Sequence, residues 1–157
     1  MRLLASTAAL ALVVACGGNG EGDLLGPGDL SSFSATVTGG SAGSYSGFSS
    51  AVPSSGLFSI GMSTGDGKFA LGFSRTGTRP TTGTYELGTN AQTGFTAALR
   101  INTDQVIYTS SSGTLTITSS SSTEIKGTFS FTGTVTAGAS TSTNVSGSFS
   151  APCPVGC

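Results

Sequence analysis

Cysteine is the residue in this sequence that offers the widest choice of chemistry, and it occurs at three positions. Cys16 ends an apolar run near the amino terminus, whereas Cys153 and Cys157 lie close together at the carboxyl terminus. A thiol can carry a lipid, form a disulfide, bind a metal ion or act as a nucleophile. The residues around each cysteine, and the residue types that the chain lacks, decide which of these roles we expect.

The chain contains no histidine and no tryptophan. Without histidine, the usual general base for serine and cysteine nucleophiles is missing, and so are zinc and copper sites with an imidazole ligand. No two carboxylates are placed by the sequence for glycoside hydrolysis. We therefore predict that the protein is not an enzyme and has no catalytic residues, no metal site and no cofactor.

Residues 1–15 contain Arg2 and then an apolar run. The run has about 13 residues, and a helix needs roughly 20 to span a bilayer, so a cleaved signal peptide is expected and a buried helix is the alternative. The residues before Cys16, Val13-Val14-Ala15, resemble the lipobox of bacterial lipoproteins. This resemblance implies cleavage before Cys16, a diacylglycerol group on its sulfur and stable membrane attachment through two or more acyl chains. An ordinary signal peptide followed by an incidental cysteine is the alternative.

Gly17 follows the predicted lipid-bearing Cys16. Aspartate at this position tends to retain Gram-negative lipoproteins at the inner membrane. For a Gram-negative source, the resemblance therefore implies delivery to the outer membrane, on its periplasmic or surface face. Residues 16–31 are rich in glycine, proline and acidic side chains and show no apolar period, which predicts a flexible tether. The acidic residues of this segment lack the spacing of a calcium-binding loop.

The charge of the chain limits its partners. Charged residues make up 8% of the sequence and the formal net charge is -1. No basic field is present that would attract nucleic acid, so we predict no nucleic-acid partner. The partners that we expect are the membrane, through Cys16, and either a protein or a small apolar ligand.

Serine, threonine and glycine supply nearly half of the chain, which is typical either of disorder or of short strands joined by turns. The apolar pattern favours strands. In residues 123–135, Ile125, Phe129 and Phe131 share one parity and polar residues hold the other, as in a strand with one buried face. We predict one all-β antiparallel domain over residues 32–152, folded as a β-sandwich or an up-and-down barrel.

About ten strands are expected in this domain. They lie near residues 32–38, 44–52, 57–63, 68–75, 82–87, 94–101, 105–110, 113–119, 123–135 and 144–151. Hairpin registers follow from the rule that apolar residues face one another on the buried side. Loops at 66–67, 103–104 and 120–122 set Met62 against Leu71, Leu99 against Tyr108, and Ile117 against Ile125.

The second half of the chain also resembles a family. A Gly-Thr-aliphatic-Thr-Ile-Thr strand at residues 113–118, a Gly-Thr-Phe-Ser-Phe strand at 127–131 and a closing Gly-x-Phe at 147–149 resemble uncharacterised bacterial β-rich lipoproteins and secreted β-domains. The resemblance covers roughly half of the chain. It implies a β fold and no activity that can be transferred.

Cys153 and Cys157 remain as a pair once Cys16 carries a lipid. Because an exported protein meets an oxidising compartment, we predict a local disulfide in the tail at residues 153–157; two free thiols are the alternative. Arg75 shares the parity of the apolar residues before it and is expected to point inward at a strand end, with Arg79 four residues later. An anion-binding rim and a solvated rim charge are both open there.

These observations lead to one functional hypothesis and one alternative. The hypothesis is a non-catalytic, lipid-anchored β-domain of the cell envelope that serves as a structural or binding module. The alternative is a lipocalin-like carrier of a small apolar ligand, because an interior lined by phenylalanine and leucine suits either a packed core or such a cargo.

Overall fold

The computed structural model describes residues 31–40, 42–90, 92–101, 106–135 and 141–157. The predicted signal peptide and nearly all of the predicted tether lie outside these residues. The described residues form β1 (Ser32–Gly39), β2 (Gly43–Ser54), β3 (Leu57–Ser63), β4 (Phe69–Thr76), β5 (Gly83–Glu86), β6 (Thr96–Ile101), β7 (Val106–Ser120), β8 (Glu124–Val135) and β9 (Ser142–Pro152).

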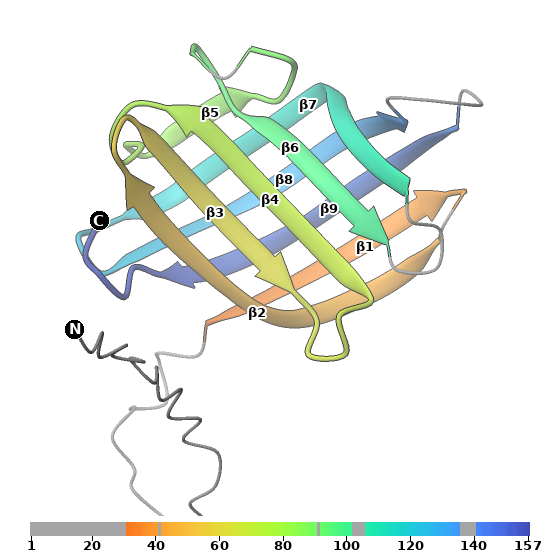
Figure 1. The fold of residues 1–157 in the computed structure, drawn as a ribbon, viewed down its shortest axis with the longest axis horizontal. Helices are drawn as coiled ribbons and strands as arrows, with labels where there is room; N and C mark the ends of the chain where they lie inside the picture. The colour runs from red at the N-terminus through yellow and green to blue at the C-terminus, as the bar shows by residue number, and fades with distance from the viewer. Residues whose placement is uncertain (1–30, 41, 91, 102–105, 136–140) are drawn as a thin grey trace, which may run out of the picture.

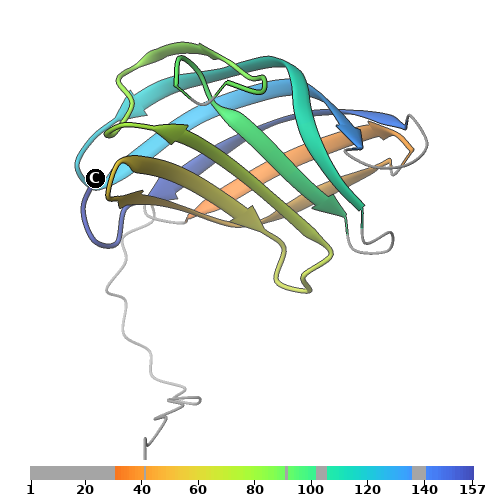
Figure 2. The same cartoon turned by 45° about the horizontal axis from the view of Figure 1, so that its top comes forward.

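These strands form a single antiparallel sheet that closes into a barrel (Figures 1 and 2). Apart from the short strand β5, each strand pairs with the next one along the chain, β9 returns to pair with β1, and β8 pairs with β7. The predicted all-β antiparallel fold is confirmed, and of the two predicted architectures the protein adopts the up-and-down barrel. Closure leaves no unpaired edge among the eight barrel strands.

The prediction of two strands at 105–110 and 113–119 is wrong, because β7 runs through both. The pairing with β8 shifts between Ser110 and Ser112, so a bulge replaces the expected turn. The serine run resembles a turn in sequence, but the bulge lets the strand continue with its parity changed. One edge of β7 then pairs with β6 in its first half and with β5 in its second half.

The hairpin registers are partly confirmed. Met62 pairs with Leu71 and Leu99 pairs with Tyr108, as predicted, although the expected loop at 103–104 lies outside the described residues. The third register is wrong, since Ile117 pairs with Gly127 and not with Ile125. A second register shift, of one residue, follows Ile117. The observed partner of Ile117 lies two residues from the predicted one, so the same face of the strand stays buried.

Aromatic side chains fill the middle of the barrel. Phe73 of β4 lies 5.3 Å from Phe129 of β8, and Phe33 of β1 lies 5.3 Å from Phe69 of β4, measured between ring centroids. These rings come from strands that do not pair with each other, so they meet across the interior. An eight-stranded barrel has an interior just wide enough for side chains of this size.

The turn between β3 and β4 is held by a charged hydrogen-bond network. Asp66 Oδ1 accepts from Thr64 Oγ1 at 2.7 Å and from the backbone N–H of Lys68 at 3.0 Å. The bond from Thr64, followed by the bonds and charge of Lys68, lowers the pKa of Asp66 from 3.8 to about 2. The folded protein therefore prefers the ionised carboxylate.

The low pKa of Asp66 predicts a stability contribution that depends on pH. Because the folded state binds this proton less tightly than the unfolded state, the contribution is full above pH 3.8 and is lost as the pH falls through about 2. We expect the urea midpoints of the wild type and of D66N to converge as the pH is lowered from 3.8 to about 2. A difference that stays constant across it would contradict the assignment.

Candidate functional site

The outer surface of the barrel carries an apolar hollow of about 570 Å³. It lies over β2, β3, β4, β6 and the start of β7, which are neighbours in the sheet and form one wall of the barrel in Figure 1. A volume of this size is within the range of small-molecule and peptide-side-chain sites. We call this feature the outer hollow, and it is defined by the two rows of residues described next.

Two neighbouring rows of outward-facing residues make the outer hollow. In the first row the strand register joins Phe48, Ser63, Ala70, Arg100 and Ile107. In the second row it joins Ser50, Gly61, Gly72 and Ala98. Small residues in the middle of both rows leave the wall thin there, and larger residues at the ends of the first row stand above it.

The ends of the first row are apolar and exposed. Phe48 is 64% exposed and Ile107 is 53% exposed, and both belong to the outer hollow. Contact with water is unfavourable for such side chains, and exposed apolar patches with a polar surround mark interaction sites. The two side chains therefore present apolar surface to solvent at opposite ends of the first row.

Two glycines form the floor, although the fold does not require glycine at either position. A Cβ atom built on Gly61 or Gly72 meets nothing within 4 Å, and neither residue has a positive φ. Glycine inside a strand is less stable than alanine by roughly 0.5–1 kcal/mol. What these two glycines provide is open space in which a ligand or another backbone can approach the sheet closely.

Arg100 supplies the charge of the outer hollow. Arg100 is exposed. Two ion pairs are recorded among the described residues, Asp66 with Lys68 and Glu124 with Lys126. None of these involves Arg100. The outer hollow thus combines an apolar floor, two apolar side chains and one cation, which is the chemistry that binds an apolar group next to an anionic one.

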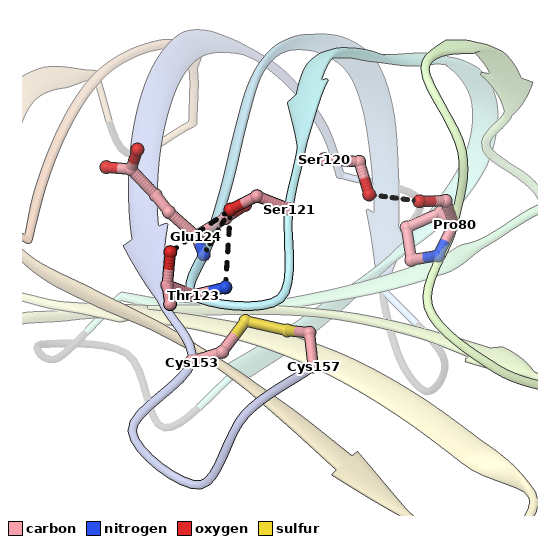
Figure 3. Close-up of a disulfide and its surroundings, with 7 residues drawn as sticks. All are labelled: Pro80, Ser120, Ser121, Thr123, Glu124, Cys153 and Cys157. Carbon is pink, nitrogen blue, oxygen red and sulfur yellow. Dashed lines mark hydrogen bonds between the residues drawn. A yellow bond between two sulfur atoms is a disulfide. The ribbon is translucent and has the colours of Figure 1, made fainter.

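The predicted residues lie elsewhere. Cys16 is outside the described residues. A disulfide joins Cys153 and Cys157, the pairing that the sequence predicts, with 5.5 Å between their Cα atoms (Figure 3). The backbone N–H of Cys153 donates to Thr123 O and that of Cys157 donates to Ser122 O, which ties the tail to the β7–β8 turn. This disulfide closes the tail at one end of the barrel, and neither cysteine lines the outer hollow.

Arg75 shares the inward side of the sheet with its register partner Phe58 and is partly buried, as its parity predicts, and two aromatic rings lie against it. Its guanidinium carbon lies 5.1 Å from the centre of the Tyr85 ring and 5.5 Å from that of Phe95. Such cation–π contacts stabilise a partly buried cation. Arg79, the other residue of the expected rim, is partly buried as well, and no contact joins the two arginines among those that the structure records.

The sequence contains a signal for the outer hollow in residues that depart from the alternation of their strands. Phe48 and Ile107 break the polar parity of their strands, and Gly61 and Gly72 occupy outward positions inside strands. Each departure is ordinary when it stands alone. Only the register shows that all four lie on one surface.

The described residues contain no group of three or more histidine, cysteine, aspartate or glutamate residues arranged to hold a metal ion. They also contain no helix that is long and apolar enough to cross a membrane.

Comparison with known proteins places the chain in a family. No curated protein and no solved structure gives a significant match. The family described as "Domain of unknown function (DUF6252)" matches residues 45–151, from β2 into β9, so the match includes every strand of the outer hollow. With this much of the barrel matched, the chain belongs to the DUF6252 family, a family of unknown function.

Proposed function

We propose that this protein is a non-catalytic, lipid-anchored domain of the bacterial cell envelope that works as a binding module. The observation that carries the proposal is the outer hollow, with its glycine floor, its exposed Phe48 and Ile107, and its cation Arg100. The barrel is a closed, well-paired scaffold, and a rigid scaffold that presents one apolar recess on its surface is suited to binding.

The anchor part of the proposal rests on Cys16. Its position directly after an apolar run and a small residue, Ala15, supports lipidation, and a membrane-held mature chain would place the barrel at the envelope surface. We expect the intact mass of protein extracted from membranes to correspond to a chain that begins at Cys16 and carries acyl groups. The C16S variant should lose both the added mass and its membrane association. An unacylated mature chain would rule out the anchor.

A surface site is favoured over an interior one by the packing of the barrel. The rings of Phe73 and Phe129 meet across the interior, which is what a core role for these side chains requires. A carrier of small ligands would need an apolar cavity in the same place. The outer hollow is already open on the surface, so a ligand can enter it without any rearrangement of the barrel.

The experiment uses a probe with the chemistry that the outer hollow offers. 1-Anilinonaphthalene-8-sulfonate has apolar rings and an anionic group, and its fluorescence rises when it leaves water. We expect it to bind the mature chain carrying Cys16→Ser. The G72L variant, which fills the floor, should bind the probe about tenfold more weakly, a change of about 1.4 kcal/mol. R100Q should weaken binding of this probe but not of the uncharged N-phenyl-1-naphthylamine.

T128L is the matched control for the leucine substitution. Thr128 faces outward on β8, outside the outer hollow, so leucine there adds apolar surface without filling the recess. Its probe binding should equal that of the parent chain. Thermal unfolding of both variants verifies that the barrel is intact. Equal probe binding by G72L and T128L would overturn the proposal.

A further inference from the structure

The described chain enters the barrel at the margin of the outer hollow. Phe33 of β1 pairs with Gly47 of β2, so the preceding residue, Ser32, lies beside Phe48, which follows Gly47. The hydroxyl of Ser49 donates to the backbone carbonyl of Ser32 at 3.2 Å and holds the two strands together at this point. Whatever precedes Ser32 therefore starts next to the Phe48 end of the first row.

The segment that precedes Ser32 is long enough to cross the outer hollow. From β1 to β6, where Arg100 lies, the sheet order gives four strand spacings, or about 19 Å at about 4.8 Å each. An extended residue spans about 3.3 Å, so about six residues cover this distance. Residues 23–31 provide this length with a margin for the turn that the chain must make on leaving β1.

The composition of this segment complements that of the outer hollow. Residues 23–30 read Asp-Leu-Leu-Gly-Pro-Gly-Asp-Leu, with Leu24 and Leu25 together and an acidic residue, Asp23, at the far end from Ser32. The outer hollow has its apolar floor between Phe48 and Arg100. A segment that crosses from β1 brings its leucines over the glycines and its carboxylate to the cation.

We propose that residues 23–30 of this chain bind in the outer hollow, with Leu24 and Leu25 over the Gly61 and Gly72 floor and Asp23 next to Arg100. This inference rests on the proposed function, because it requires the outer hollow to be a binding site. A docked segment acts as an internal competitor, because a partner with the same apolar and anionic chemistry must displace it. The apparent affinity of that partner is its intrinsic affinity multiplied by the fraction of chains in which the outer hollow is free.

The test replaces the two leucines and follows the floor directly. In the mature chain carrying Cys16→Ser, L24S/L25S should shift the backbone amide resonances of Gly61 and Gly72 and leave those of β8 unchanged. It should also tighten binding of 1-anilinonaphthalene-8-sulfonate by about threefold or more, because the competitor is gone. L24I/L25I keeps the apolar surface and is the matched control, and it should behave like the parent chain.

A synthetic peptide of residues 20–31 provides a second measurement. Added to L24S/L25S, it should return the Gly61 and Gly72 amides toward their positions in the parent chain, and the G72L substitution should abolish this effect. Unchanged glycine amides in L24S/L25S would overturn the inference and leave the proposed function standing if the probe still binds. A probe that binds no variant, while the amides do shift, would instead remove the proposed function. A dimer in sedimentation that G72L dissociates would assign the outer hollow to a second copy and also overturn the inference.

Discussion

Replacing Phe73 with alanine is expected to lower the free energy of unfolding by about 3–5 kcal/mol, which makes it the most damaging single change proposed for this protein. Phe73 is only 1% exposed. Its ring contacts those of Phe129, at 5.3 Å, and Phe131, at 6.2 Å. Truncation removes the buried ring and leaves a cavity that the surrounding strands, held by their ladders on both sides, can close only in part.

Urea unfolding measures this loss, with F48A as the control. Phe48 is of the same residue type but is 64% exposed, so its removal should change the stability by less than about 0.5 kcal/mol. The F73A variant also addresses the carrier alternative, because it should gain binding of a small aromatic ligand such as benzene that the parent chain does not bind. Binding of benzene inside the parent barrel, or a loss in F73A no larger than in F48A, would contradict the packed interior.

Substitution of Gly147 is expected to have the second largest effect. Gly147 of β9 pairs with Phe129 of β8, and Phe149 of β9 pairs with Gly127 of β8, so each ring lies over the glycine opposite it. A Cβ at Gly147 would collide with the backbone oxygen of Ser34 and would lie 2.6 Å from Phe129 Cζ. Since backbone on one side and a buried ring on the other must move, we expect G147A to cost about 1–3 kcal/mol.

G72A is the matched control for Gly147. Both glycines lie inside strands of the same barrel, but a Cβ at Gly72 meets nothing within 4 Å. Alanine there should leave the protein unchanged or raise its stability by about 0.5–1 kcal/mol. Opposite signs for G147A and G72A in urea unfolding would show that the first glycine is required by packing and the second by the open surface. Equal effects would contradict both assignments.

Local pattern was sufficient for the parts of the fold that depend on neighbours in sequence. The alternation in Ile125, Phe129 and Phe131 predicted strands with one buried face, and these residues are buried. The β3–β4 and β6–β7 registers followed from apolar pairs across short connections, because a short connection leaves few ways to align two strands. The third hairpin failed where a bulge intervened, since a bulge changes the register without changing which residues are apolar.

The candidate site could not be predicted in the same way. Phe48, Ala70, Arg100 and Ile107 belong to four different strands and lie in one row only because each strand pairs with its neighbour in one particular register. If any one strand shifted its register by a single residue, its side chain in this row would move from the outer surface to the side that faces the core. The proposal for residues 23–30 likewise depends on the β1–β2 register, because only that register puts Ser32 beside Phe48.

By itself, the sequence determined that this is an all-β antiparallel protein, which strand faces are buried, and that two cysteines at the carboxyl terminus are close enough to pair; it is also the sole basis for the predicted anchor at Cys16. These properties depend on alternation and on residues a few positions apart. The tertiary structure alone decided between sandwich and barrel, because closure depends on β1 pairing with β9, more than a hundred residues away along the chain. It also decided the outer hollow, because a surface row across five strands exists only once every register is set.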